Sequence, residues 1–214
     1  MCGALLLIGL SVELASAEKK PAPEPPAMLI SVYDRTGMPP RLLSKAGERT
    51  TRIFRKAGIA MVWLDCWPGV CNQLQLAYCS GQASSIHLVL TILPEQMAHR
   101  LPQTIEKFGI ALAEGGRGSY AYVFFGRIEK FAKEDSLDPA ELLGTVAAHE
   151  IGHLMLGPES HTASGIMAAR WGSNELMQLK TGNLLFSDEQ SDLLRRRLAS
   201  SVLGAVPTPA STPK

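Results

Sequence analysis

The stretch Leu142–Met167, LLGTVAAHEIGHLMLGPESHTASGIM, contains the residues that decide the fold. It follows Asp138 and Pro139, a residue type that caps helix N-termini and one that suits the first helical position. Gly157, with Pro158 after it, ends the predicted helix. Because almost every residue between these signals is apolar, the sequence predicts a helix buried in the core of a domain.

Three ionisable side chains, His149, Glu150 and His153, interrupt this apolar helix in an H-E-x-x-H pattern. Burying such groups is costly unless something binds them. Residues four apart on a helix differ by about 40° around the axis and lie about 6 Å apart along it, so both imidazoles face one side. The two histidines therefore form half of a tetrahedral zinc site. Glu150 lies at its flank, where a carboxylate can accept a proton from water.

A third ligand must come from outside the helix. His161 lies just beyond the helix end, and a short return of the chain costs little entropy. We therefore expect His161 to complete the site, leaving the fourth zinc position open as in catalytic centres. Glu175 is the main alternative ligand, and Glu159, in the same turn as Pro158, ranks after it.

The segment HEIGHLMLGPESHTASGIM resembles the metzincin signature of zinc metalloproteases, H-E-x-x-H-x-x-G-x-x-H followed by a methionine turn. It is also similar to small secreted bacterial zincin-like proteins that carry HEIGHLLLG, a further histidine and GIM. The resemblance is confined to about residues 148–169. It implies three zinc ligands, a general base and a methionine packed beneath the metal: His149, His153 and His161, Glu150, and Met167 respectively.

The chain departs from the family pattern in three places. Leu156 stands where the family has its glycine, and Gly157 comes one residue later. His161 comes two residues later than the family's third histidine, a shift that a longer helix would absorb. The family's tyrosine after the methionine is missing, because Ala168 and Ala169 follow. Any contact that this tyrosine makes to the transition state must come from another residue.

The remaining patterns predict an α+β domain of zincin-like fold, with a mixed twisted β-sheet packed against the long helix. Apolar and β-branched runs predict strands at residues 28–33, 59–64 and 86–93, the last one buried on both faces. Residues 108–113 and 120–125 predict a hairpin. Helical spacing predicts an amphipathic helix at residues 39–58 and a C-terminal helix at 187–197 that covers the core.

Both ends of the chain are expected to lie outside the domain, which spans residues 28–203. Residues 1–17 hold an apolar run, Ala4–Leu10, and then Ala15-Ser16-Ala17, which is typical of a cleaved export signal. Residues 18–27 are a proline-rich linker, and residues 204–214 form a similar disordered tail. We expect the protein to be secreted or periplasmic, with no membrane contact after signal cleavage.

Composition and cysteine content limit the partners. Among 214 residues, 21 Lys and Arg balance 20 Asp and Glu, so no overall field attracts nucleic acid. The 46% apolar content excludes a disordered chain. Export favours a disulfide among Cys66, Cys71 and Cys79, whose pairing stays open. We expect a monomer.

The expected function is a secreted zinc metallopeptidase that cleaves a peptide or protein substrate. A Zn²⁺-activated water attacks the peptide bond, and Glu150 takes the proton. By the same resemblance, the predicted hairpin forms a rim along which an extended peptide adds as a strand. The alternative is a non-catalytic zinc-binding recognition module on a degenerate zincin fold, which a closed ligand shell would indicate. The same chemistry also permits hydrolysis of a non-protein amide.

Overall fold

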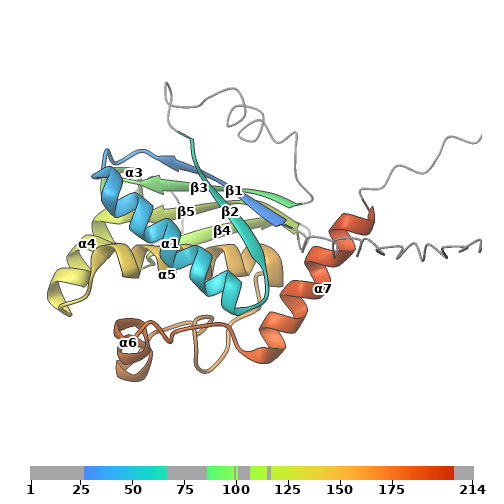
Figure 1. Ribbon diagram of the computed structural model, residues 1–214. Coiled ribbons are helices and arrows are strands. Elements are labelled where there is room, and N and C mark those ends of the chain that lie inside the picture. The colour runs from blue at the N-terminus through green and yellow to red at the C-terminus, as the bar shows by residue number, and fades with distance from the viewer. Residues whose placement is uncertain (1–26, 67–85, 99, 101–106, 115–116, 205–214) are drawn as a thin grey trace, which may run out of the picture.

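The computed structural model describes residues 27–66, 86–98, 100, 107–114 and 117–204 of the chain. The strands are β1 (Ala27–Asp34), β2 (Ala60–Asp65), β3 (Ile86–Leu93), β4 (Gly109–Glu114) and β5 (Arg117–Phe124). The helices are α1 (Pro40–Lys56), α3 (Glu95–Ala98), α4 (Phe125–Glu134), α5 (Pro139–Leu156), α6 (Ser173–Lys180) and α7 (Asp188–Gly204). The strands form one twisted sheet, and the long helices lie on one side of it (Figure 1).

The sheet is mixed, with strand order β2-β1-β3-β5-β4. β1 runs parallel to β2 and β3, and β3 runs parallel to β5. β4 returns antiparallel to β5 and forms the edge of the sheet. A parallel pair needs a crossover connection, which α1 supplies between β1 and β2. The predicted mixed sheet, long helix and C-terminal helix are confirmed.

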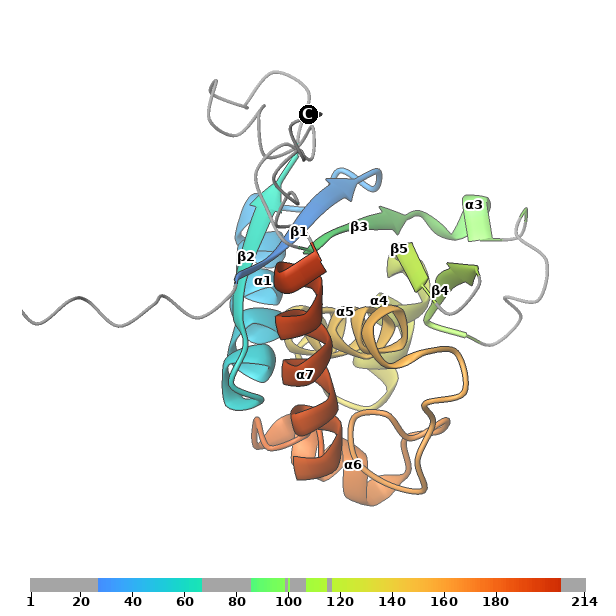
Figure 2. The same cartoon turned by 90° about the vertical axis from the view of Figure 1, so that its right-hand side faces the viewer.

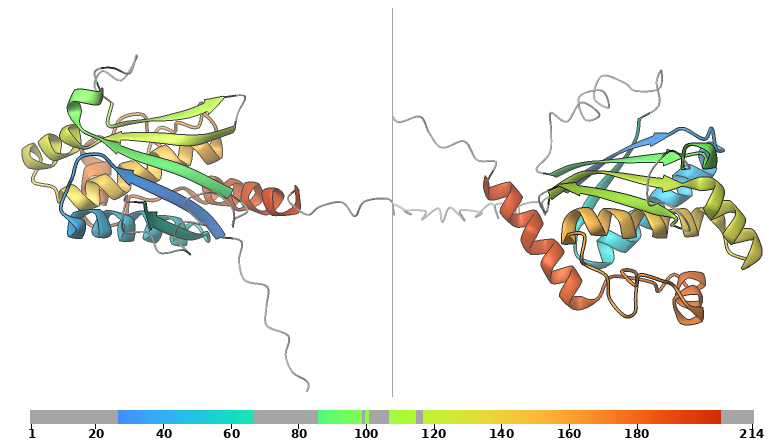
Figure 3. Two further views of the ribbon diagram at one scale, coloured as in Figure 1. Left: turned by 90° about the horizontal axis from the view of Figure 1, so that it is seen from above. Right: turned by 180° about the vertical axis from the view of Figure 1, so that it is seen from behind.

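The core lies between the sheet and the two helices α1 and α5. Ile30, Leu90 and Val123 point into it from three neighbouring strands, and each is fully buried. Nearly every residue of α5 is buried, as its apolar sequence predicts. Figure 3 shows the sheet lying across α1 and α5, with α6 on the far side of α5. The helix that carries the H-E-x-x-H residues is thus the centre of the molecule.

The central strand β3 differs from the expectation of a strand buried on both faces. Leu88, Leu90 and Ile92 are buried, whereas Val89 and Thr91 between them are only half-buried. The reason is that the long helices cover one face of the sheet, so burial alternates along the strand.

A buried arginine joins α1 to α5, the site helix that carries the H-E-x-x-H residues. The Arg49 side chain is completely buried, and its Nε donates to Thr145 Oγ1 of α5 at 3.1 Å. Its Nη1 donates to Gly182 O at 2.8 Å and its Nη2 to Leu184 O at 3.1 Å. The Glu141 carboxylate lies 3.6 Å from Nε and offsets the buried charge. One side chain therefore fixes α1, α5 and the segment after α6 together.

The C-terminal helix α7 covers the end of this assembly (Figure 2). Leu194 and Leu198 are buried, Arg197 donates to Met155 O of α5, and Arg195 Nη1 donates to Ala57 O at 2.6 Å. Within the described part of the chain, no helix combines the length and apolarity needed to cross a bilayer.

Several expectations fall on residues outside the described ranges. These include the export signal at 1–17, most of the linker at 18–27, and the tail from residue 205. Cys71 and Cys79 also lie outside, while Cys66 is buried at the end of β2. The domain boundaries and the disulfide pairing therefore stay predictions.

Candidate metal centre

Helix α5 begins and ends where its capping residues predict. Asp138 Oδ1 accepts hydrogen bonds from the backbone N–H groups of Ala140 at 2.9 Å and Glu141 at 3.4 Å. At the other end, Gly157 has φ of 107°, a left-handed conformation that glycine adopts without strain. Its N–H donates to His153 O at 2.8 Å. The helix therefore ends at Leu156, three residues after the second histidine, and the chain turns back.

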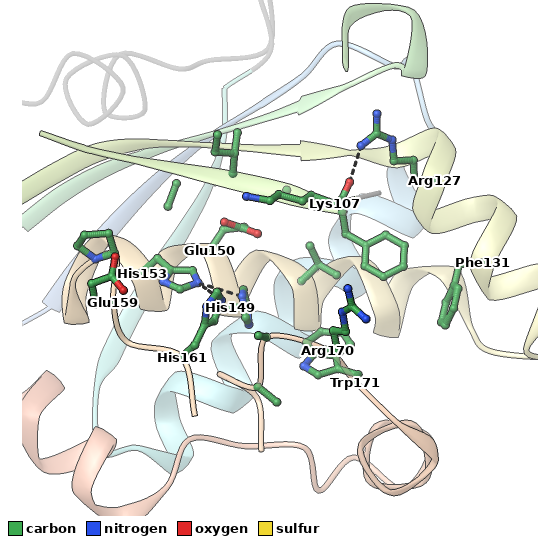
Figure 4. A pocket seen from close by; sticks show the side chains of 18 of the residues that line it. Lys107, Arg127, Phe131, His149, Glu150, His153, Glu159, His161, Arg170 and Trp171 are labelled. Atoms are coloured by element: carbon green, nitrogen blue, oxygen red, sulfur yellow. Dashed lines mark hydrogen bonds between the residues drawn. The ribbon is translucent and has the colours of Figure 1, made fainter. Parts of the chain in front are cut away.

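The turn after α5 returns the chain beneath the helix. Thr162 N–H donates to Met167 O at 3.0 Å, and Ala168 N–H donates to Gly165 O at 3.0 Å. These bonds close the SGIM segment into a tight loop in which Gly165 has φ of 82°. The loop places His161 opposite the two helical histidines (Figure 4).

The three histidines converge on one point. His153 Nε2 lies 3.1 Å from His149 Nε2 and 3.0 Å from His161 Nε2. Tetrahedral zinc with bonds of about 2.0–2.1 Å holds its ligand nitrogens about 3.3 Å apart. Among the described residues, these three form the group of His, Cys, Asp and Glu side chains that could hold one metal ion. They lie close enough to bind it.

Backbone carbonyls orient two of the rings. His149 Nδ1 donates to Ile166 O at 2.7 Å, and His153 Nδ1 donates to Gly157 O at 3.3 Å, with Ser160 Oγ 3.1 Å from the same nitrogen. Since a carbonyl only accepts, each Nδ1 carries the proton and each Nε2 lone pair is free for a cation. Burial lowers the pKa of His149 to about 4 and also lowers the pKa of His153. Both rings are therefore neutral at pH 7.

Met167 packs against helix α5. Its side chain is fully buried against Gly152 of α5, and a Cβ at Gly152 would approach Met167 Sδ to 2.7 Å. The same Cβ would lie 3.0 Å from Phe186 Cε1. The glycine between the two helical histidines thus provides the space that lets the methionine turn pack against α5.

Glu150 occupies a niche between α5 and the edge strand. It is 6% exposed, and burial raises its pKa to about 8, while the nearby Lys107 ammonium acts in the opposite direction. A Cβ at Gly109 of β4 would lie 2.7 Å from Glu150 Oε1 and 2.7 Å from Tyr122 O. Only glycine leaves room for the carboxylate here, and an isolated glycine inside a strand pattern is a known sign of such close approach.

The two alternative ligands lie elsewhere. Glu175 is buried at the start of α6, where its Oε2 accepts from Gly172 N–H at 3.0 Å and so caps that helix. Glu159 is exposed beside Pro158 at one end of the cavity (Figure 4). Neither belongs to the group that could hold one ion.

A cavity of about 870 Å³ opens over the histidines. Gly109, Ile110 and Ala111 of the edge strand form one side, and Ala168 to Trp171 form the other. Trp171 Nε1 donates to Ile166 O at 3.1 Å, the carbonyl that also accepts from His149. Sequence reasoning missed Trp171 and Arg170, although both directly follow the methionine turn. It also missed Lys107, which only the tertiary fold brings to the site.

No family model matches the chain, and no curated protein matches it. Solved structures are similar to it at low identity. Archaemetzincin from Methanopyrus kandleri is 17% identical, with 83% of this chain and 98% of that one covered and a TM-score of 0.49. A zinc-dependent peptidase from Methanocorpusculum labreanum is 16% identical, with 77% and 99% covered and a TM-score of 0.48.

A Thermotoga maritima protein solved in solution is 12% identical, with 86% of this chain and 100% of that one covered and a TM-score of 0.32. All three TM-scores lie below 0.5.

Proposed function

We propose that the protein is a zinc-dependent metallopeptidase. His149, His153 and His161 hold the metal, and Glu150 is the general base. The observation that carries the proposal is the convergence of three Nε2 atoms, 3.0–3.1 Å from one to the next, beside a buried carboxylate in an open cavity. A structural zinc site has no need of that carboxylate or that opening.

The donor set fits zinc. Imidazoles whose second nitrogens bond carbonyl or hydroxyl oxygens, as those of His149 and His153 do, are typical of zinc ligands. With His161 they make three protein ligands, which leave one tetrahedral position free. When bound there, zinc would polarise a substrate carbonyl and lower the pKa of a bound water to about 7. Burial of His149 and His153 keeps their rings unprotonated, so protons do not compete for the Nε2 lone pairs.

Glu150 carries the proton in this mechanism. Its carboxylate takes a proton from the attacking water and passes it to the leaving amine. Its niche beside Gly109 fixes its position, because the strand backbone and α5 enclose it. Burial moves the Glu150 pKa upward toward the working pH, and a cation held by the adjacent histidines would move it back down.

The edge strand β4 is the element along which we place the substrate. It pairs with β5 on one side, and Gly109, Ile110 and Ala111 border the cavity. Unpaired backbone groups of an edge strand bind an extended peptide as an additional strand. A peptide held in this way passes over the three histidines with its backbone carbonyls near Glu150.

The test is cleavage of a broad peptide library by zinc-loaded protein, read by mass spectrometry. Glu150→Gln is expected to lower the rate about 10²–10⁴-fold without loss of zinc, because it removes only the proton acceptor. The matched control is Glu129→Gln, which alters an exposed carboxylate of α4 outside the cavity. An unchanged rate in Glu150→Gln, or no cleavage by fully loaded wild-type protein, contradicts the proposal.

A non-catalytic recognition module is the second candidate. Ala168 and Ala169 border the cavity after the methionine turn, where no hydroxyl is available to contact a transition state. Under this candidate, zinc-loaded protein binds peptides with the same affinity whether residue 150 is Glu or Gln, and cleaves none.

We further propose that residues 1–17 direct export to the periplasm or the medium. N-terminal sequencing of protein recovered outside the cytoplasm is expected to begin at Glu18. Full-length protein retained in the cytoplasm contradicts this proposal.

A further inference from the structure

The two residues that directly follow the methionine turn offer the cavity no side-chain hydrogen-bond donor. They are Ala168 and Ala169, and both border the cavity where the metzincin pattern has a tyrosine. Addition of water to a peptide bond moves an electron pair onto the carbonyl oxygen, and a donor held near that oxygen lowers the barrier. Such a donor must therefore come from another part of the cavity wall.

Two basic residues of α4 border the cavity, but carboxylates of the protein already balance their charges. Arg127 Nε lies 3.1 Å from Glu95 Oε1, and Arg127 Nη1 donates to Lys107 O at 2.7 Å. Lys130 Nζ lies 4.0 Å from Glu134 Oε1 on the same helix. These two cations are therefore less available to a bound peptide.

Lys107 is the cation that lies over Glu150 and the histidines. It immediately precedes β4, and its side chain extends across the cavity above the Glu150 carboxylate (Figure 4). The Lys107 ammonium lowers the pKa of Glu150 against the rise that burial causes, and it adds to the lowering of the His153 pKa, which burial dominates. Its charge thus reaches both groups. Arg170, by contrast, lies on the far side of the cavity beside Trp171.

The Lys107 backbone is held in place, while its ammonium is free. In the described ranges, the ammonium forms no ion pair or hydrogen bond within the protein. Arg127 binds Lys107 O, and Phe108 O accepts from Phe124 N–H of β5 at 2.8 Å. The exposed side chain can therefore turn toward a peptide bound along β4, and that peptide would shield the contact from water and strengthen it.

We propose that Lys107 is a catalytic residue that donates a hydrogen bond to the carbonyl oxygen of the scissile peptide bond. This inference rests on the proposed function and adds a residue to it. The water oxygen bonds to the carbonyl carbon, the π electron pair of the C=O bond moves to oxygen, and Glu150 takes the proton of the water. Lys107 keeps its three protons and stabilises the new negative charge. When the pair returns, the C–N bond breaks and the amine leaves with the proton from Glu150.

The first test is kinetic and uses zinc-loaded protein with one peptide that the wild type cleaves. Lys107→Met keeps the length of the side chain and removes its charge. We expect kcat/KM to fall about 10²–10³-fold, mainly through kcat, with zinc content unchanged. Lys107→Arg should restore part of the loss, because a guanidinium also donates. Lys133→Met, on the exposed surface of α4 and outside the cavity, is the control and keeps the wild-type rate.

A binding measurement separates catalysis by Lys107 from a role in packing. A phosphinic peptide carries a tetrahedral, negatively charged phosphinate in place of the scissile amide. Calorimetry compares its affinity with that of the matching substrate on zinc-loaded Glu150→Gln protein and on the double variant Glu150→Gln/Lys107→Met. Because residue 150 is Gln in both proteins, any effect of Lys107 through the Glu150 carboxylate is removed.

Loss of the ammonium is expected to weaken phosphinate binding at least about tenfold and to change substrate binding by less than about twofold. A merely structural role would weaken both ligands alike, so equal changes overturn the proposal. Cleavage at equal rates by the wild type and Lys107→Met also overturns it and leaves the peptidase standing. No cleavage by fully loaded wild-type protein refutes the peptidase, and the catalytic role of Lys107 with it.

Discussion

Glu150 is the residue whose environment is most unusual. A carboxylate in a niche closed by the backbone of β4 loses most of its hydration, and ionisation is therefore costly. Because burial raises the Glu150 pKa from 4.5 in the unfolded chain to about 8 in the fold, the folded chain holds a proton that the unfolded chain has released. Its contribution to stability is fully present below pH 4.5 and is lost as pH rises toward 8.

Glu150→Gln is accordingly expected to stabilise the metal-free chain at high pH. The variant and the wild type should be nearly equal at pH 4.5, and the difference in free energy of unfolding should grow to at most about 4 kcal/mol near pH 8. Urea unfolding across this range measures it. A difference that stays constant with pH means that the Glu150 carboxylate is not held protonated by the fold.

The Ile166 carbonyl is a shared acceptor, since it binds both His149 Nδ1 and Trp171 Nε1. Trp171→Phe removes one donor and leaves the ring orientation of His149 less constrained. We expect a loss of zinc affinity of up to about tenfold, measured by competition with a chelator. Trp63→Phe is the control, because the Trp63 Nε1 group has no hydrogen-bond partner. Equal losses in both variants would mean that Trp171 acts only through general packing.

At the scale of elements, the close approach of α1 and α5 sets the position of the site helix. A Cβ at Gly144 of α5 would overlap Ala46 O and lie 2.7 Å from Arg49 Cβ. Thr50 Oγ1 also donates to Gly144 O at 2.9 Å. Neither backbone can yield without shifting a whole helix, so this contact fixes the spacing between the two helices.

Gly144→Ala is expected to destabilise the fold. Overpacking at a backbone contact costs about 1–3 kcal/mol, which exceeds the gain of about 1 kcal/mol from better helix propensity. Gly172→Ala is the matched control, because a Cβ there meets only Glu175 Oε2, at an ordinary 3.6 Å. Thermal unfolding of the two variants compares them. A Gly144→Ala variant as stable as the control would contradict the close packing of α1 against α5.

The elements were largely predictable because their signals are local. Asp138, Pro139 and Gly157 mark the ends of α5, and period-two or apolar runs mark the strands. Long-range placements were not predictable. Arg49 is a charged residue on an amphipathic helix, so its sequence pattern suggests a solvent-facing side chain. Its burial is possible because the fold brings three hydrogen-bond acceptors to its guanidinium: the Thr145 hydroxyl and two carbonyl groups from the segment after α6.

The residues of the site likewise divide into those that the local sequence predicts and those that only the tertiary fold brings together. His149, Glu150 and His153 share one helix turn, so spacing alone places them together, and His161 follows after a short return. The cavity walls come from β4, α4 and the segment after Met167, which meet only in the folded chain. Lys107 is near Glu150 in space but more than forty residues away in sequence. No local sequence pattern predicts that such a residue lies at the site.

For the whole molecule, the histidine cluster joins the central helix to the loop that returns beneath it. A cation that binds the folded chain and not the unfolded one stabilises the fold by mass action, about 2.7 kcal/mol when its concentration is one hundred times Kd. Zinc is thus expected to raise the unfolding temperature of the wild-type chain, as calorimetry with and without zinc can measure. His161→Ala should remove most of that increase. An equal increase in both proteins would mean that the ion binds elsewhere.

The central claim is that three histidines form one zinc site, and the most direct test is zinc content per chain by elemental analysis. The wild-type protein and His87→Gln, whose ring lies on β3 beside Ser31, are each expected to hold about one zinc. His149→Ala, His153→Ala and His161→Ala are each expected to lose most of it after dialysis against a weak chelator. Retention of one zinc by all three variants, or its absence from the wild type when zinc is supplied, would contradict the account.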